Sequence, residues 1–168
     1  MTKCLVVIKT IRCMVILVRI PCMVLYGDHG NDSITDASGL NTLFGCDDND
    51  SLESTSSQSA TLYGGRHDDT LVDSNADDTL LGDHDNDSVV GRARDDWIEG
   101  ADGDDTLDGQ EGSADTINFH NSDAAVTVDL LSGFAQGEGA DVINSFEVAI
   151  GSAFEDVLFG AEISQSTL

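Results

Sequence analysis

An aspartate returns every nine residues through the middle of this chain. Aligned nonapeptides such as GDHGNDSIT, GGRHDDTLV and GADGDDTLD carry it at their sixth position. The sixth-position residues are Asp32, Asn41, Asp50, Asp69, Asp78, Asp87, Asp96 and Asp105. Carboxylates are hard oxygen ligands, so a regular series of them predicts the binding of a hard cation.

The rest of each nonapeptide predicts how these aspartates are positioned. The eighth position is always aliphatic: Ile34, Leu43, Leu52, Leu71, Leu80, Val89, Ile98 and Leu107. The first half is rich in Gly, Asp and Asn, which favour turns, and a short strand follows it. Such a strand cannot bury its apolar residue alone, so the units must stack as a solenoid. We therefore predict an all-β fold, a parallel β-roll in which two nonapeptides complete one coil.

This coil places the aspartates in two columns. The first holds Asp69, Asp87 and Asp105, with Asp32 and Asp50 as a shorter pair before a gap in the repeats. The second holds Asp78 and Asp96, joined by Asp115 if one residue near Ser113 is looped out. Like charges about 5 Å apart cost roughly 3 kcal/mol per pair at an effective dielectric near 20. The columns therefore require a neutralising cation.

Calcium fits this requirement best. Ca²⁺ accepts carboxylate and backbone carbonyl oxygens in a flexible geometry, whereas Mg²⁺ demands a tight octahedron and keeps its waters. Glycine-rich turns expose their carbonyls, and the carbonyl ligands are predicted at Gly64, Gly82, Gly91, Gly100 and Gly103.

The repeat pattern G-G-x-G-x-D-x-U-x, with U aliphatic, is the RTX nonapeptide. In this pattern the chain resembles the hemolysin-type calcium-binding repeats of secreted bacterial proteins, best in residues 27–35 and 100–108. With its C-terminal flank, the resemblance covers about residues 25–161. It implies a non-catalytic β-roll with Ca²⁺ between turns, an extracellular location, and folding triggered by calcium after export. It also implies the rest of a larger RTX protein as a partner.

Departures from the pattern predict several weak sites rather than a full set. The fourth-position glycine is replaced in several turns, by Asp48, His67, Ala76, Asp85 and Arg94. A non-glycine residue in left-handed geometry costs about 1–2 kcal/mol. Residues 54–60 contain no acidic residue, so we expect a vacant or bulged turn there.

Composition narrows the function classes. A net charge of −25 excludes nucleic acid as a partner, because phosphate would be repelled. An acidic, aromatic-poor chain is also typical of disorder, and disorder of the metal-free state is an alternative compatible with calcium binding. The strict aliphatic at position eight argues against permanent disorder.

Three segments are expected. Residues 1–25 are a hydrophobic tract with cysteines nine residues apart; 26–118 are the β-roll; 119–168 are a β-rich flank or cap that looks truncated. The tract is hypothesised to be repeat DNA translated out of frame, which the nucleotide sequence would test. As alternatives, it adds coils to the roll or acts as a signal peptide. Lys9, Arg12 and Arg19 interrupt its apolar runs, so no membrane span is predicted.

The flank predicts further strands. Val126, Val128 and Leu130 alternate and should share one face, and Phe146, Val148 and Ile150 should form a second alternating strand.

No catalytic motif is present, and His29, His67, His84 and His120 are interpreted as surface imidazoles. We therefore predict that the protein is not an enzyme. The alternative function is an accessory polysaccharide-binding module of an extracellular enzyme such as an alginate epimerase. Trp97, Arg92 and Arg94 would then contact an acidic polysaccharide.

Overall fold

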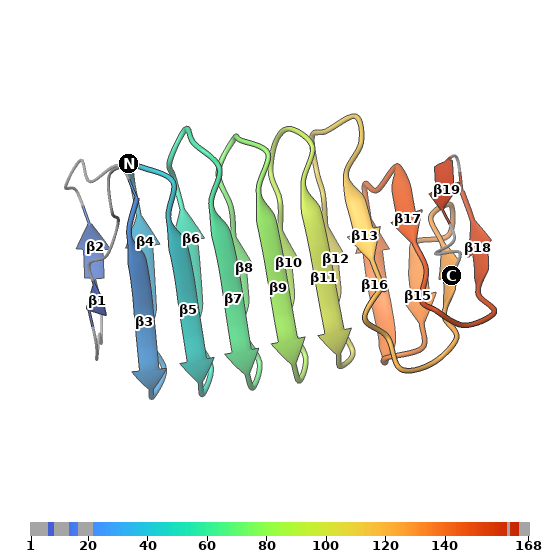
Figure 1. Cartoon of the computed structure of the whole chain (residues 1–168), viewed down its shortest axis with the longest axis horizontal. Helices are drawn as coiled ribbons and strands as arrows, with labels where there is room; N and C mark the ends of the chain where they lie inside the picture. Colours follow the sequence, from blue (N-terminus) through green and yellow to red (C-terminus); the bar gives the residue numbers. More distant parts are fainter. Residues whose placement is uncertain (1–6, 9–13, 17–21, 161, 165–168) are drawn as a thin grey trace.

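The computed structural model describes residues 7–8, 14–16, 22–160 and 162–164, and its regular structure consists of strands. The strands form two sheets that lie face to face and run along the length of the molecule (Figure 1). The first sheet contains, in spatial order, β1 (Val7–Ile8), β3 (Val24–His29), β5 (Thr42–Asp47), β7 (Thr61–Arg66), β9 (Thr79–His84), β11 (Trp97–Asp102), β13 (Thr116–Asn118), β17 (Val148–Ile150) and β19 (Glu162–Ser164). The second contains β2 (Met14–Ile16), β4 (Ser33–Asp36), β6 (Ser51–Ser54), β8 (Thr70–Val72), β10 (Ser88–Val90), β12 (Thr106–Asp108), β16 (Ala140–Asn144), β15 (Phe134–Gln136), β14 (Thr127–Asp129) and β18 (Val157–Phe159).

The chain alternates between the sheets, and successive strands of each sheet pair in parallel through the repeat region. Leu43 is in register with Leu62, Leu62 with Leu80, and Leu80 with Ile98, so equivalent positions of successive turns stack directly. The result is a β-solenoid of about five turns. The predicted all-β parallel β-roll is confirmed.

The core is the space between the two sheets. All eight predicted position-eight aliphatics are completely buried in it, together with Leu25, Leu62 and Ile117. The residues at position seven point outward, as Ser88 and Thr106 do. On the outer face of the first sheet, Tyr26, Phe44 and Tyr63 stack with ring centroids 4.8 and 4.7 Å apart. Each strand therefore contributes one core residue, as the period-nine pattern predicts.

The Leu71→Ala substitution is expected to lower the free energy of unfolding by about 2–5 kcal/mol, because it leaves a cavity in a core one side chain wide. Urea denaturation at saturating Ca²⁺ measures this. The neighbouring Thr70 is exposed on the same strand, so Thr70→Ser is the control and should change stability by about 0.5 kcal/mol or less. Equal effects at both positions would contradict the assignment of the core.

The gap in the repeats is a bulged turn. Asp32 and Asp50 are 18 residues apart, whereas Asp50 and Asp69 are 19 apart, although all three occupy equivalent places in successive turns. The extra residue lies in the turn 54–60, as predicted. The same spacing of 19 separates Asp96 from Asp115, which confirms the residue looped out near Ser113.

The flank continues both sheets. After β13 the chain makes an excursion through β14 and the antiparallel β15, and β16 then pairs in parallel with β12. Val126 and Val128 are buried and Leu130 packs against the core, so their common face is confirmed.

The predicted alternation of Phe146, Val148 and Ile150 is wrong. Phe146 is buried, but within β17 the core residue is Ala149, while Val148 and Ile150 are half-buried. Ser145 adopts a positive φ of 59° in the turn before β17, which interrupts the alternation. Ala149 then stacks in register on Ile117.

At the N-terminal end, the described parts of the hydrophobic tract extend the two sheets. Strand β1 pairs with β3 and β2 pairs with β4, both in parallel. Cys4 and Cys13, on which the frame-shift hypothesis partly rests, lie outside the described residues. Within the described parts of the chain, no helix has the length and apolar character needed to cross a bilayer.

Candidate metal centre

A row of buried aspartates occupies the turns that lead from the first sheet to the second and ends at the start of β16. The row consists of Asp32, Asp50, Asp69, Asp87, Asp105 and Asp141, whose exposed fractions lie between 1% and 6%. From Asp50 onward, each Oδ1 accepts a hydrogen bond from the backbone N–H of the row's residue one turn earlier, at 2.7–3.2 Å. We call this row the first column. Its hydrogen bonds tie successive turns together.

The second carboxylate oxygens of this column have a different environment. The Oδ2 atoms of Asp50, Asp69, Asp87, Asp105 and Asp141 are buried and accept no hydrogen bond from any residue that the structure describes. A buried acceptor without a partner costs about 1–3 kcal/mol, and more when it is charged. The turns therefore carry a row of oxygens that require a partner.

Glycines at position one of the repeat line the space beside these oxygens. A Cβ placed on Gly64 would lie 2.5 Å from Asp69 Oδ2 and 2.7 Å from the carbonyl oxygen of Gly82 in the next turn. A Cβ on Gly45 would lie 2.5 Å from both Asp50 Oδ2 and the Gly64 carbonyl oxygen. Carboxylate and carbonyl oxygens from two successive turns thus converge where a side chain is excluded. A donor set made only of oxygens fits Ca²⁺.

A second column lies in the turns that lead back from the second sheet to the first. It contains Asn41, Ala60, Asp78, Asp96 and Asp115, and Glu147 continues it. Asp78 Oδ1 accepts from Ala60 N at 2.5 Å, Asp96 Oδ1 from Asp78 N at 2.9 Å, and Asp115 Oδ1 from Asp96 N at 2.8 Å. Asn41 and Ala60 leave the first part of this column without carboxylates.

The structure therefore brings all eight predicted aspartates into two columns. Of the predicted glycines, Gly64, Gly82 and Gly100 occupy position one beside the first column, and Gly91 does so beside the second. Gly103 lies at position four, packed against the backbone carbonyl of Asp85.

Three further acidic residues accept equivalent backbone hydrogen bonds and were not among the ligands predicted from the sequence, although 156–160 resembles the start of another repeat. Asp141 continues the first column, Glu147 accepts from Asp115 N at 3.0 Å, and Asp156 accepts from Val126 N at 2.9 Å. Asp141 and Asp156 each precede an aliphatic residue by two positions, as in every repeat, so a signal was present. Asp141 follows Asp105 by 36 residues, and the residues between them do not keep the nonapeptide pattern, which concealed this signal.

Several turns carry the predicted backbone strain. At position four, Asp48, His67, Asp85 and Arg94 have φ values of 78°, 76°, 73° and 84°, the left-handed region that favours glycine. Ala76 holds the same position but is not among the described residues with positive φ, so its turn has another conformation.

Burial and mutual repulsion change the acidity of the columns. Burial raises the pKa to about 6 for Asp50 and Asp105, to about 7 for Asp69 and Asp141, and to about 8 for Asp87 and Asp96. The backbone N–H bonded to each Oδ1 lowers the pKa in part, and neighbouring carboxylates raise it again. Without a cation, these six carboxylates are therefore held partly protonated near neutral pH.

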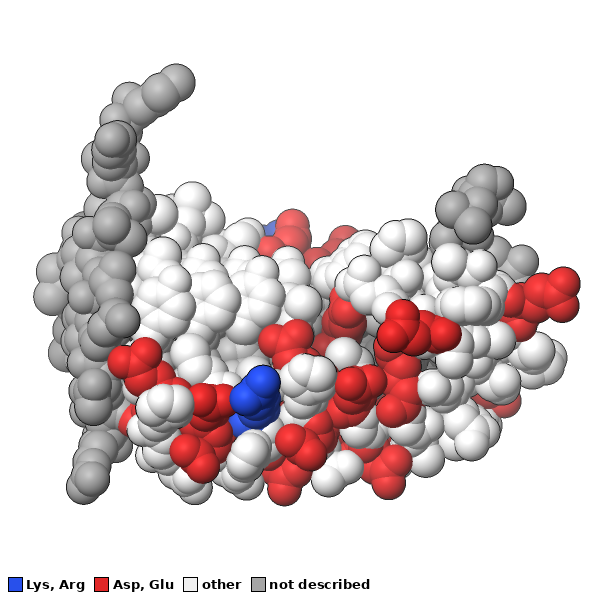
Figure 2. All heavy atoms as spheres, turned by 60° about the horizontal axis from the view of Figure 1, so that its bottom comes forward, with Lys and Arg blue, Asp and Glu red and all other residues white. Residues whose placement is uncertain are grey.

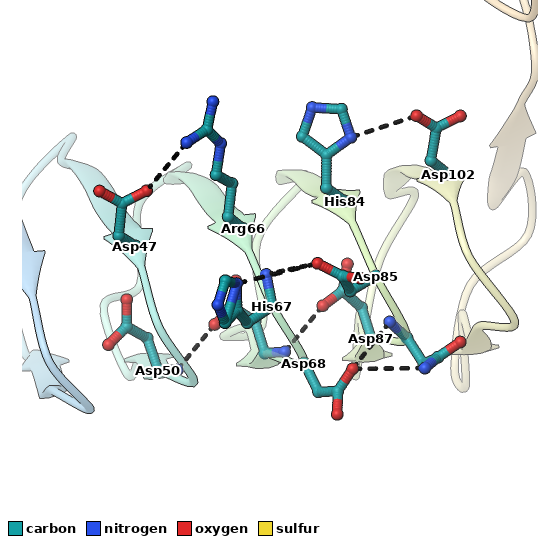
Figure 3. Close-up of polar contacts among 11 residues, drawn as sticks. Asp47, Asp50, Arg66, His67, Asp68, His84, Asp85, Asp87 and Asp102 are labelled. Carbon is teal, nitrogen blue, oxygen red and sulfur yellow. Dashed lines mark hydrogen bonds and ion pairs between the residues drawn. The ribbon is translucent and has the colours of Figure 1, made fainter.

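Outside the first column, charged side chains form an exposed rim (Figure 3). His29 Nδ1 lies 2.8 Å from Asp47 Oδ2, and His84 Nδ1 lies 3.1 Å from Asp102 Oδ2. Such exposed pairs contribute about 0–1 kcal/mol. Acidic side chains dominate this edge of the roll (Figure 2). The histidines here are surface groups, as predicted.

These features define the class of the protein, a β-roll of calcium-binding repeats. A family model described as the RTX calcium-binding nonapeptide repeat matches residues 24–55, 63–93 and 85–115, about half of the chain. The chain belongs to this family, whose repeats are a non-catalytic, calcium-binding type. The matches omit residues 56–62, within and just after the bulged turn. No curated protein and no solved structure matches this chain.

Proposed function

We propose that this protein is a non-catalytic module of a secreted bacterial protein, and that it holds Ca²⁺ between successive turns of its roll. The observation that carries the proposal is the row of buried Oδ2 atoms without hydrogen bonds from described residues; those of Asp50, Asp69, Asp87 and Asp105 each lie beside a position-one glycine. The proposed ligands are the carboxylates of Asp32, Asp50, Asp69, Asp78, Asp87, Asp96, Asp105 and Asp115, and the carbonyls of Gly64, Gly82, Gly91, Gly100 and Gly103. Asp141 adds a ligand from the flank.

Folding is coupled to binding in this proposal. The columns bring ionised carboxylates together only in the folded roll, so Ca²⁺ binds the folded state in preference to the unfolded chain. Ligands with that preference stabilise folding by mass action. The proposal places folding outside the cell, because extracellular calcium modules have dissociation constants of about 0.1–1 mM. Proteins with this repeat are typically secreted.

A titration of the full chain with Ca²⁺ from zero to about 10 mM, followed by far-UV circular dichroism, tests the proposal. We expect a coil-to-β transition with Ca²⁺ and a much smaller change with Mg²⁺. No spectral change with Ca²⁺, or an equal response to Mg²⁺, would contradict it.

The polysaccharide-binding alternative stays a prediction. Trp97 is 39% exposed on the first sheet, but Arg92 Nη2 lies 2.9 Å from Glu53 Oε1 and is already paired. Calcium-dependent retention on an alginate column would favour this role.

A further inference from the structure

The turn 73–78, between β8 and β9, differs from the two turns that follow it in the second column. Its position one is Asp73, whereas the next two turns have Gly91 and Gly109 there. Asp73 is completely buried, and its backbone N–H donates to the carbonyl of Val90 at 2.9 Å. Its Oδ1 accepts from Ser74 N at 2.7 Å, while its Oδ2 accepts no hydrogen bond within the described chain.

Asp73 is part of a cluster of three carboxylates from two successive turns. One oxygen from each of Asp73, Asp78 and Asp96 lies within 4.8 Å of the other two, and all three residues are buried. Asp78 is fixed by Ala60 N at 2.5 Å and by the hydroxyl of Ser74 at 3.0 Å. The Asp96 Oδ2 atom, like that of Asp73, receives no hydrogen bond from a described residue.

No basic group compensates this cluster. None of the ion pairs of the described residues involves any of the three aspartates. Three buried carboxylates without a positive partner are costly. Two of their oxygens also receive no hydrogen bond from a basic or neutral donor among the described residues, so the cluster has the oxygen ligands of a cation site.

The turn conformation explains how Asp73 fits. In the turn 91–96, a Cβ on Gly91 would lie 2.5 Å from Asp96 Oδ2, so that turn excludes a side chain at position one. Arg92 there, at position two, has a φ of 71°, whereas Ser74, its equivalent in the turn 73–78, has no positive φ. The altered turn thus accommodates a third carboxylate where the two following turns have only backbone.

We propose that Asp73, Asp78 and Asp96 form a cation site that is tighter than the other sites of the roll and fills first. The inference rests on the proposed function and extends it, because it assigns a ligand outside the repeat pattern. Other turns offer at most two column carboxylates, and this one offers three. Calcium affinity rises with the number of charged ligands. A third negative charge also favours trivalent ions that are similar in size to Ca²⁺.

The chain provides a local probe for this site. Trp97 is the only tryptophan and directly follows Asp96. Tb³⁺, a trivalent substitute for Ca²⁺, luminesces when a nearby tryptophan transfers energy to it. In the full chain we expect a tight Tb³⁺ phase excited through Trp97, displaced by Ca²⁺. Asp73→Asn should weaken this phase about tenfold, while a second, weaker phase remains.

Two further variants make the result decisive. Asp73→Gly restores the residue of the neighbouring turns, so it is expected to fold with Ca²⁺ and to lose the tight phase as well. Asp36→Asn is the matched control, because Asp36 is equally buried at position one but lies beside Asn41 and Ala60. It should leave the tight phase unchanged.

The outcomes separate the inference from the proposed function. If the wild-type chain shows no Ca²⁺-dependent circular dichroism and binds no Tb³⁺, the proposed function fails. If it folds with Ca²⁺ but both Asp73 variants retain the tight phase, only the third carboxylate ligand is overturned. An equal loss in Asp36→Asn would also overturn it, because that residue has no carboxylate partner in its column.

Discussion

The Asp87→Ala protein is expected to lose Ca²⁺-induced folding of the middle turns at calcium concentrations that fold the wild type. Asp87 lies at the centre of the first column: its Oδ1 accepts from Asp69 N, and its N–H donates to Asp105 Oδ1, both at 2.8 Å. Its Oδ2 is one of the unpartnered oxygens among the described residues. The substitution removes a proposed ligand that bridges two turns and leaves the Asp69 N–H buried without its acceptor, at a cost of about 1–3 kcal/mol.

Circular dichroism against Ca²⁺ concentration measures this effect. One further variant separates the loss of charge from the loss of the hydrogen-bond acceptor, and another serves as a control. Asp87→Asn keeps an acceptor oxygen but removes the charge, so it should lower calcium affinity while costing less stability at saturation. Asp85→Asn changes an exposed carboxylate two residues away and should behave nearly as the wild type. If Asp85→Asn and Asp87→Ala shifted the calcium midpoint equally, general charge rather than the column would control folding.

The period of the sequence was sufficient to predict the roll. A nine-residue repeat with one aliphatic residue defines both the strand and its inward face, because each short strand has a single core position. Ile34, Leu80 and Leu107 could therefore be assigned to the core without coordinates. The same nine-residue spacing predicts the two aspartate columns, including the looped-out residue before Asp115.

What the sequence could not predict lies where the period breaks. Asp141 returns to the first column only after the excursion through β14 and β15, and the length of such an excursion is not encoded in the repeat. Ala149 takes the core position that alternation assigned to Val148, because the turn at Ser145 resets the phase. Local alternation predicts a face only within one uninterrupted strand.

Asp73 illustrates a different limit of prediction from the sequence. In the sequence it stands where the pattern requires glycine, and it was one of many acidic residues in an acidic chain. Only the structure shows that its side chain is buried against Asp78 and Asp96. A departure from a repeat pattern can therefore add a candidate ligand as well as remove one, and only burial distinguishes the two cases.

Acidification is expected to stabilise the metal-free roll and to weaken its binding of Ca²⁺. Burial raises the pKa of Asp69 to about 7 and those of Asp87 and Asp96 to about 8, whereas the unfolded chain has values near 3.8. Between these limits the folded state binds more protons than the unfolded state. Its stability is therefore fully present below about pH 4 and is lost as the pH rises toward 8.

Calcium reverses this trend, because it requires the ionised carboxylates that a proton would otherwise neutralise. The calcium midpoint should thus fall as the pH rises from about 5.5 to 8, by roughly tenfold per pH unit for each proton displaced. Circular dichroism with EDTA at low and high pH, and calcium titrations across the range, measure both effects. In Asp87→Asn the slope should be smaller, because one titrating carboxylate is gone. A midpoint that stayed constant between pH 6 and 8 would show that Ca²⁺ does not compete with protons for these carboxylates, and would contradict their role as ligands.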